Sequence, residues 1–256
     1  MIDSRERIIE LQRESYDYKK IDAHAHIGYT GGWADVGMTP EEMIRQMDEF
    51  NIEAAAVCCP DNDATLDMAR RYPGRVIACA YMDPLNDSVE TIKSYLKKGF
   101  SAVKLNPLRN AYCADSEMLD PFLDAAERFG VPVVIHSGHP PYSLPWQIAL
   151  LAERHPDVKV LMLHMGHGHG VYIDAALKMA RRHPNIYLEF SGMPMPDKIL
   201  EAYQTVGADR VLFGTDMPFH HITTELQKLI VSGLDEPAIR RVLYDNAYDF
   251  FQKKQR

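Results

Sequence analysis

The sequence lacks any apolar run approaching the roughly 20 residues that a membrane-spanning helix requires. Its first residues, MIDSRERIIELQRES, are charged and lack the apolar core of a signal peptide. Cysteines are few, and none are spaced as C-x-x-C: they are Cys58, Cys59, Cys79 and Cys113. We therefore expect a cytoplasmic protein with reduced thiols, rather than a disulfide framework or a zinc clip.

A basic surface is also missing. The 28 Lys and Arg residues are outnumbered by 36 Asp and Glu residues, which leaves a formal net charge of −8. No basic stretch alternates with aromatic residues, so nucleic acid is not an expected partner. The 256 residues are 46% hydrophobic and contain no linker, which indicates one domain with a sizeable core.

Short apolar runs recur along the chain and alternate with longer amphipathic stretches. The runs are rich in Val, Ile and Leu and predict buried strands at residues 21–26, 54–59, 76–82, 102–106, 131–136, 160–164, 186–191 and 211–216. Their ends recur roughly every 25–30 residues, which is the size of a strand-plus-helix unit.

Helix boundaries are also recognisable between these runs. The segment Thr39-Pro40-Glu41-Glu42 is a capping box with proline at the first helical position, and Gly130 is placed to end another helix. Together these features predict a single-domain α/β protein, a TIM (β/α)8 barrel over residues 19–256, preceded by an extra helix in residues 1–18. An open doubly wound sheet is the alternative, but no Gly-rich phosphate turn follows the first strand.

Histidines gather at one kind of position. Of the 11 histidines, nine lie at or just after the carboxyl end of a predicted strand: His24, His26, His136, His139, His164, His167, His169, His220 and His221. The carboxyl ends of all barrel strands form one face, where barrel active sites lie. The clustering therefore predicts an active site built from imidazoles.

Strand alternation gives these side chains a direction. If His24 and His26 point inward, Ala23 and Ala25 point outward to the helices. The same rule allows His136 and Asp216 to point inward. An H-x-H pair alone is weak, and His136 or Asp216 alone could be structural. Together, three imidazoles and a carboxylate match Zn²⁺ best, with Mn²⁺, Fe²⁺ or Co²⁺ as alternatives.

At these residues the sequence resembles the amidohydrolase superfamily, and more narrowly the amidohydrolase-related branch that contains aminocarboxymuconate-semialdehyde decarboxylase. The matching segments are Ile21-Asp-Ala-His-Ala-His26, Val103-Lys-Leu-Asn-Pro107, Val133-Val-Ile-His-Ser-Gly138, Leu161-Met-Leu-His-Met-Gly166 and Leu212-Phe-Gly-Thr-Asp-Met-Pro218. The resemblance implies that one divalent ion per chain is held by His24, His26, His136 and Asp216. It places His164 beside the ion, as a proton carrier or a group that polarises the substrate.

Lys104 has more than one interpretation. In binuclear members of the superfamily a lysine at the end of strand four is carboxylated and bridges two metals. The favoured interpretation here is a buried ion pair with Glu189, or contact with the substrate. Other expected substrate contacts are His139, His167 and Arg109. The roles of His169, His220 and His221 stay open.

The leading hypothesis for the reaction is hydrolysis of an ester, lactone or amide bond in a small, carboxylated substrate. The ion would lower the pKa of a bound water, Asp216 would accept its proton, and His164 would stabilise the oxyanion. The first alternative is non-oxidative decarboxylation of a small aromatic or unsaturated acid. The second is a metal-binding or ligand-binding barrel without catalysis. The expected partner is a small molecule, with a homodimer as the default assembly.

Overall fold

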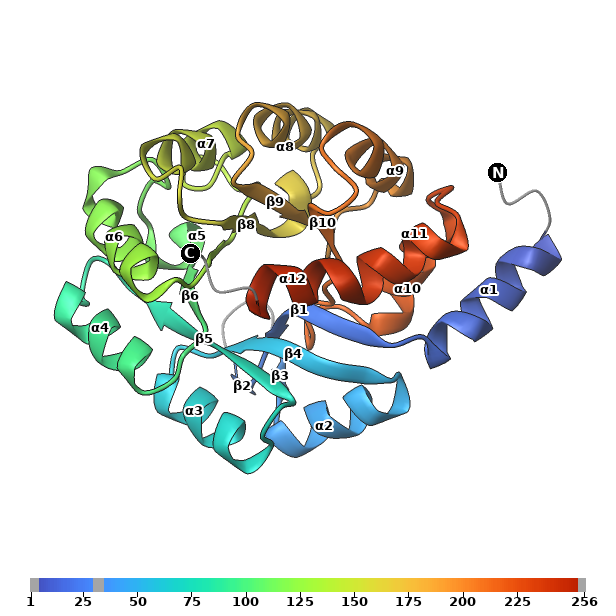
Figure 1. Cartoon of the computed structure of the whole chain (residues 1–256), viewed down its shortest axis with the longest axis horizontal. Helices are drawn as coiled ribbons and strands as arrows, with labels where there is room; N and C mark the ends of the chain where they lie inside the picture. Colours follow the sequence, from blue (N-terminus) through green and yellow to red (C-terminus); the bar gives the residue numbers. More distant parts are fainter. Residues whose placement is uncertain (1–4, 30–34, 253–256) are drawn as a thin grey trace.

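The computed structural model describes residues 5–29 and 35–252 and forms a ring of strands surrounded by helices (Figure 1). Eight parallel strands follow one another in the order β1-β4-β5-β6-β7-β8-β9-β10. They are β1 (Lys20–His26), β4 (Ile52–Cys58), β5 (Val76–Met82), β6 (Ala102–Leu105), β7 (Val133–Ile135), β8 (Val160–Met162), β9 (Ile186–Glu189) and β10 (Val211–Leu212). The predicted TIM barrel is confirmed.

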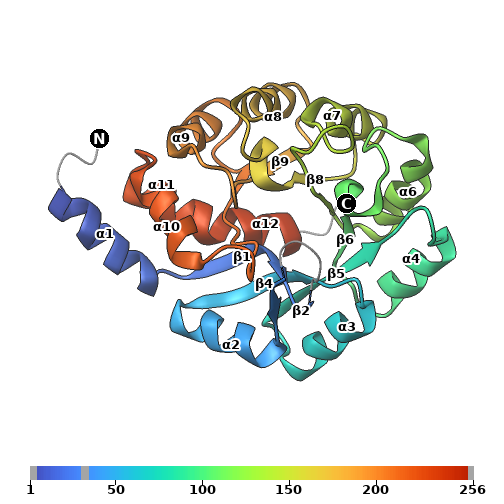
Figure 2. The ribbon, with the colours of Figure 1, turned by 180° about the vertical axis from the view of Figure 1, so that it is seen from behind.

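Helices cover the outside of the strands, as the view from behind also shows (Figure 2). They are α2 (Pro40–Glu49), α3 (Asn62–Arg71), α4 (Val89–Lys97), α6 (Asp120–Phe129), α7 (Pro145–Arg154), α8 (Gly170–Arg182), α9 (Pro196–Thr205) and α10 (Ile222–Val231). Shorter elements are β2 (Gly28–Tyr29), β3 (Gly37–Met38), α5 (Pro107–Asn110), η1 (Glu117–Leu119), η2 (Leu163–Gly166), α11 (Glu236–Arg240), η3 (Arg241–Asp245) and α12 (Asn246–Gln252).

The predicted helix boundaries are present. At the start of α2, the Thr39 hydroxyl accepts a hydrogen bond from Glu42 N at 3.2 Å, and the Glu42 carboxylate accepts one from Thr39 N at 2.8 Å. Gly130 ends α6 with φ 66°, a left-handed conformation that glycine adopts without a steric penalty. Local sequence therefore determines where these helices begin and end.

The N-terminal helix α1 (Arg5–Asp17) confirms the predicted extension within the described residues, whereas residues 1–4 lie outside them. The helix lies at the edge of the ring against α10 (Figure 1).

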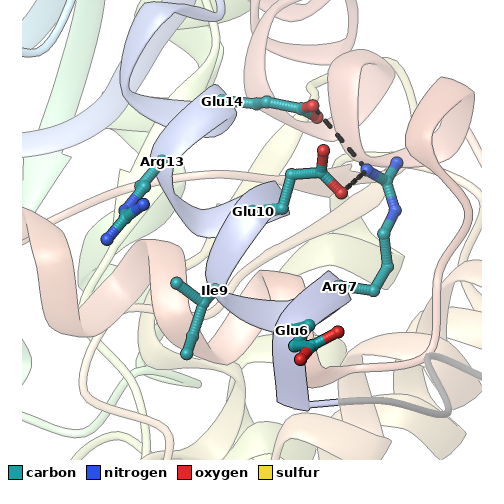
Figure 3. A pocket seen from close by; sticks show the side chains of 6 residues that line it. All are labelled: Glu6, Arg7, Ile9, Glu10, Arg13 and Glu14. Atoms are coloured by element: carbon teal, nitrogen blue, oxygen red, sulfur yellow. Dashed lines mark hydrogen bonds and ion pairs between the residues drawn. The ribbon is translucent and has the colours of Figure 1, made fainter.

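A shallow hollow on α1 is lined only by its own side chains, among which Arg7 pairs with Glu10 at 2.7 Å (Figure 3). No catalytic candidate contributes to this hollow. Among the residues described, no helix is long and apolar enough to cross a membrane.

Two apolar clusters fill the molecule. The larger lies between the strands and the surrounding helices, and it contains Ala25. The smaller joins inward strand residues, such as Ala56, to Phe250 of α12, which passes across the ring in Figure 1. Ala23 belongs to this smaller cluster, so the prediction that it points outward is wrong. The reason is a register shift between Asp22 and Ala25 against β4, which changes the phase of the alternation.

Six of the eight strands end earlier than predicted, and three of these end before a predicted site residue. β7, β8 and β10 stop at Ile135, Met162 and Leu212, before the histidine or aspartate that follows each of them. His164 and Asp216 have φ values of 61° and 55°, which no strand accommodates. The carboxyl ends of these strands therefore turn into loops that carry the candidate site.

Candidate metal centre

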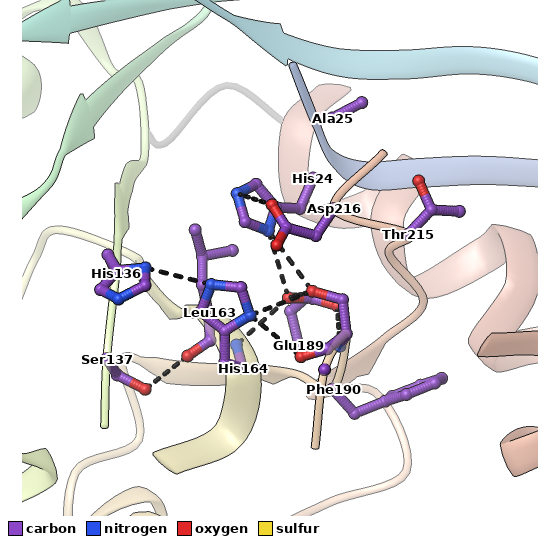
Figure 4. A network of polar contacts seen from close by, with 12 residues as sticks. His24, Ala25, His136, Ser137, Leu163, His164, Glu189, Phe190, Thr215 and Asp216 are labelled. Carbon is purple, nitrogen blue, oxygen red and sulfur yellow. Dashed lines mark hydrogen bonds and ion pairs between the residues drawn. The ribbon is translucent and has the colours of Figure 1, made fainter. Parts of the chain in front are cut away.

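The polar side chains converge at the carboxyl ends of the strands (Figure 4). His24 and His26 lie on β1, and His136 follows β7 directly. His164 lies in η2 after β8, and Asp216 follows β10. Residues that are far apart in the sequence thus meet at one end of the barrel, as the positions of the histidines predicted.

A buried carboxylate joins the first strand to the last. Asp22 accepts hydrogen bonds from His24 N at 3.0 Å, Thr215 N at 2.9 Å and Thr215 Oγ1 at 2.5 Å. Asp216 N donates in turn to the His24 carbonyl at 2.7 Å. Burial raises the pKa of Asp22 to about 7, although its hydrogen bonds oppose the shift. These contacts close the barrel and bring His24 and Asp216 together.

Three potential ligand atoms lie at the spacing expected around one ion. His26 Nε2 is 2.9 Å from His24 Nε2 and 3.1 Å from Asp216 Oδ1. His24 Nε2 is 3.4 Å from Asp216 Oδ1. Ligands about 2.1 Å from one ion and roughly at right angles lie about 3 Å apart, so this group fits a divalent metal. His164 also offers a ligand atom within 4.8 Å of those of His24 and Asp216.

His164 is held by contacts from the chain beneath it. Its Nδ1 lies 2.9 Å from the Ser191 carbonyl, and its backbone N donates to Glu189 Oε2 at 3.2 Å. Its Nε2 lies 3.1 Å from His136 Nδ1 (Figure 4). His136 therefore reaches the candidate centre through His164.

Three of these imidazoles are neutral. Burial, helped by Lys104 and by neighbouring imidazoles, lowers the pKa of His24 and His136 well below the usual range. Burial lowers the pKa of His164 to about 3, although the negative charge of the Asp216 carboxylate acts to raise it. A neutral imidazole keeps a lone pair, which is the form that binds a metal.

His26 and Asp216 form a charged pair. Burial lowers the pKa of His26, but the Cys58 thiol and the Asp216 carboxylate outweigh it and raise that pKa to about 9. Cys58 Sγ lies 3.3 Å from His26 Nδ1. Burial raises the pKa of Asp216, while His26, His164 and Lys104 lower it below the usual range. Asp216 is thus an ionised carboxylate beside His26.

The predicted Lys104–Glu189 ion pair is wrong. Both side chains are buried, but among the described residues no ion pair joins them. The His24 ring lies between them: Lys104 Nζ is 3.0 Å from His24 Nε2, and Glu189 Oε2 is 3.6 Å from His24 Nδ1. The expected burial of both groups is confirmed, but the sequence carried no information on the imidazole between them.

Two further imidazoles extend this array. His139 Nδ1 lies 2.9 Å from His136 Nε2, and the His139 and His167 rings are 4.4 Å apart between centroids. Burial lowers the pKa of His167 to about 4. Both residues keep partial exposure, so they lie where a substrate could reach them.

The remaining candidates separate into two groups. His220 faces the site, with its Nε2 3.8 Å from Asp216 Oδ2. His221 instead caps α10, because its Nδ1 accepts from Thr223 N at 3.3 Å. His169 is exposed and precedes α8, and Arg109 is exposed on α5, where its backbone N donates to Asn106. The structure therefore does not place Arg109, which was predicted to contact the substrate, beside the candidate metal centre.

Sequence reasoning missed three residues of the site. Asp22 closes the barrel, Ser191 contacts two site histidines, and Cys58 contacts His26. Asp22 is a charged residue inside an apolar strand, and this signal could have found it, since buried charges are usually paired. Ser191 and Cys58 carry no such signal in the sequence.

The sequence of this chain also matches a known protein family. The sequence profile of the Amidohydrolase family matches residues 21–253. The chain belongs to this family. The resemblance of its motifs to the amidohydrolase-related branch is thereby confirmed.

The curated relatives of this chain are decarboxylases. Gamma-resorcylate decarboxylase from Rhizobium radiobacter is 24% identical over 213 residues, which are 63% of this chain and 65% of that enzyme. The chain spans 36% to 65% of the length of the curated relatives it matches. The prediction of hydrolysis as the leading reaction is therefore wrong, and these relatives match the decarboxylation alternative instead.

Solved structures share the fold. The 5-carboxyvanillate decarboxylase of Sphingomonas paucimobilis superimposes with a TM-score of 0.72 at 14% identity, covering 92% of this chain and 99% of that one. The dihydroxybenzoic acid decarboxylase of Polaromonas sp. JS666 has a TM-score of 0.70 at 18% identity, covering 92% and 97%. That structure contains manganese and the inhibitor 2-nitroresorcinol.

Proposed function

We propose that this protein is a metal-dependent, non-oxidative decarboxylase of a small aromatic or unsaturated acid. The observation that carries the proposal is the group of His24 Nε2, His26 Nε2 and Asp216 Oδ1, separated by 2.9–3.4 Å, with His164 beside it. The activity of the curated relatives supports the choice of decarboxylation. The names of these relatives specify carboxylated aromatic substrates, which supports the substrate class.

The proposed cofactor is one divalent ion, held by His24, His26 and Asp216. The predicted fourth ligand, His136, meets this group through His164. The nitrogen and oxygen donors suit Mn²⁺, which the Polaromonas enzyme contains, and they suit Zn²⁺ as well. When bound, such an ion supplies positive charge that holds the substrate's carboxylate and a neighbouring oxygen. Metal content per purified chain identifies the ion.

The reaction requires a proton at a defined place. The bond between the carboxylate carbon and the substrate carbon breaks, its electron pair stays on the substrate carbon, and CO2 leaves. A proton then takes the place of CO2 on that carbon. Asp216 and His164 lie within 4.8 Å of each other through their ligand atoms and are the proposed proton carriers.

The substrate's other groups would meet side chains beside the metal-site group. His139 and His167 keep partial exposure beside His136, and Lys104 presents its ammonium group next to His24. We assign these three to substrate binding. Arg109 is exposed on α5 and would contact only a substrate that extends out of the barrel.

The test uses the protein loaded with Mn²⁺ and, separately, with Zn²⁺. Each form is incubated with hydroxylated benzoates and unsaturated carboxylic acids, and CO2 and the decarboxylated product are measured. Running the reaction in deuterated water should place one deuteron on the carbon that lost CO2.

Asp216→Asn and a metal-free sample are the controls, and both should lose most of the CO2 release. Absence of product across the panel from protein that holds its metal would reject the proposed reaction. A binding barrel without catalysis would then be the function that fits the protein.

A further inference from the structure

A buried carboxylate lies directly beneath two of the site histidines and takes no part in the reaction described above. Glu189, the last residue of β9, is fully buried, and its carboxylate accepts hydrogen bonds from Ser191 N, Ser191 Oγ (2.9 Å) and His164 N (3.2 Å). Its Oε2 also lies 3.6 Å from His24 Nδ1. Within the described part of the chain, His24 is the basic side chain within 4 Å of this carboxyl group, and burial raises the pKa of Glu189 to about 8.

The loop that follows the neighbouring strand β10 leaves room for this carboxylate. A Cβ atom at Gly214 would lie 2.6 Å from Glu189 Oε1, closer than real Cβ contacts come. Any side chain at position 214 would displace the Glu189 carboxylate. The packing between β9 and β10 is therefore built around Glu189.

Ser191 determines which nitrogen of His164 carries the hydrogen. The Ser191 carbonyl lies 2.9 Å from His164 Nδ1. A carbonyl oxygen only accepts hydrogen bonds, so Nδ1 of His164 must be the donor. A neutral His164 then keeps its lone pair on Nε2, the atom that faces the site.

Ser191 and Glu189 set the tautomer of His24 in a similar way. The Ser191 hydroxyl donates its hydrogen to Glu189 Oε2, so its oxygen can only accept from His24 Nδ1, which is 3.4 Å away. Glu189 Oε2 is a second acceptor on that side. His24 thus carries its hydrogen on Nδ1, and its Nε2 lone pair faces Asp216 at 3.4 Å.

We infer that Glu189 and Ser191 are positioning residues, which set the Nδ1–H tautomer of His24 and His164, so that the Nε2 lone pair of His24 is free for the metal and that of His164 faces His136. The inference rests on the metal site of the proposed function. Oxygen acceptors behind a metal-binding histidine fix its tautomer and its ring orientation, and losing them typically weakens metal binding about 10-fold to 100-fold.

The first test measures Mn²⁺ affinity by titration calorimetry, without any substrate. Glu189→Gln should weaken Mn²⁺ binding about 10-fold to 100-fold, and Ser191→Ala should weaken it several-fold, because the Ser191 carbonyl remains. Glu225→Gln is the matched control. Glu225 is also a buried glutamate, which accepts from Gly192 N at 3.4 Å but has no hydrogen bond or ion pair with His24 or His164.

The second test reads the tautomers directly in metal-free protein labelled with nitrogen-15 histidine. The wild-type spectrum should show His24 and His164 as Nδ1–H imidazoles, assigned by His24→Gln and His164→Gln. Glu189→Gln should shift the two nitrogen resonances of His24 toward the other tautomer. The spectrum of Glu225→Gln should match that of the wild type.

The outcomes decide the inference. Unchanged Mn²⁺ affinity and unchanged tautomers in Glu189→Gln would overturn it, and so would equal losses in Glu189→Gln and Glu225→Gln. If Glu189→Gln does not fold, unchanged Mn²⁺ affinity in Ser191→Ala overturns it by itself. If the wild-type protein binds no Mn²⁺, the metal site of the proposed function fails, while the tautomers still decide whether Glu189 and Ser191 set the two rings.

Discussion

Among the site residues, His164 and Asp216, like His167, have backbone conformations that residues with a Cβ atom rarely adopt. His164 has φ 61° and Asp216 has φ 55°. For residues other than glycine, such a conformation costs roughly 1–2 kcal/mol each. Hydrogen bonds offset this cost: His164 N donates to Glu189, and Asp216 N donates to the His24 carbonyl. Strain at these two positions turns the side chains toward the centre.

At Asp216 we expect a loss of turnover. Asp216→Asn removes the negative charge beside His26 and the group proposed to carry the proton, so CO2 release should fall about 10²-fold to 10⁴-fold or more. The measurement is the rate of CO2 release at matched metal content. Near-normal turnover with metal retained would mean that Asp216 is not the proton carrier.

The variant Gly214→Ala tests the packing around Glu189. Gly214→Ala would place a methyl group 2.6 Å from Glu189 Oε1. We expect it to reduce the free energy of unfolding by about 1–3 kcal/mol, measured by urea denaturation, because an overpacked interior cannot relax without displacing Glu189. Gly168→Ala is the control, since no atom beyond its chain neighbours lies within 4 Å of the added carbon. Equal stability of the two variants would contradict the close approach of Gly214 and Glu189.

At the scale of elements, the barrel closes where β10 returns to β1. β10 has only two residues, and the closure is continued by loop contacts: Ala23 N donates to Phe213 O at 2.9 Å, and His26 N donates to Met217 O at 2.8 Å. Asp22 and Thr215 reinforce this seam through side-chain hydrogen bonds. The metal-site donors of β1 and of the loop after β10 lie on the same seam, so the geometry of the seam sets the positions of these donors.

The hydroxyl of Thr215 therefore matters beyond its size. Thr215→Val keeps the shape but removes the hydrogen bonds from Thr215 Oγ1 to Asp22 (2.5 Å) and from Met217 N to Thr215 Oγ1 (3.0 Å). Chemical denaturation should show a loss of about 1–3 kcal/mol, because Asp22 and Met217 N stay buried without these partners. Thr205→Val on exposed α9 should change stability by less than about 0.5 kcal/mol. If Thr215→Val lowers the free energy of unfolding no more than Thr205→Val does, the Thr215 hydroxyl does not hold the seam together.

At the scale of the whole molecule, a bound ion would join the first and last strands. His24 and His26 belong to β1, and Asp216 follows β10, so these donors come together only in the folded barrel. A ligand that binds only the native state stabilises it by about 2.7 kcal/mol at 100 times its dissociation constant. Binding at this site is therefore coupled to the stability of the entire barrel.

This coupling is measurable by thermal unfolding. Saturating Mn²⁺ should raise the midpoint by about 5–10 °C in a domain of this size, and a chelator should reverse the rise. The double variant His24→Ala and His26→Ala should show no such rise. If Mn²⁺ raises the unfolding midpoint of the double variant as much as that of the wild type, Mn²⁺ binds elsewhere on the chain.

Local and periodic features of the sequence by themselves determine the architecture of the barrel. The apolar runs predicted all eight barrel strands, because strands buried on both faces must be apolar. Thr39 and Gly130 marked helix ends through short-range chemistry. The positions of the histidines after the strands predicted which end of the barrel carries the site, because parallel strands share one carboxyl face.

Only the tertiary structure decided the contacts inside that site. The bulge in β1 reversed the phase at Ala23, and the His24 ring lies between Lys104 and Glu189, where an ion pair was expected. Only the structure showed that His220 faces the site, because the His221 ring caps α10 instead. The physical reason is common to all three. A residue's type and spacing determine its tendency to lie inside, whereas its partner depends on strand register and loop conformation, which contacts between distant segments set.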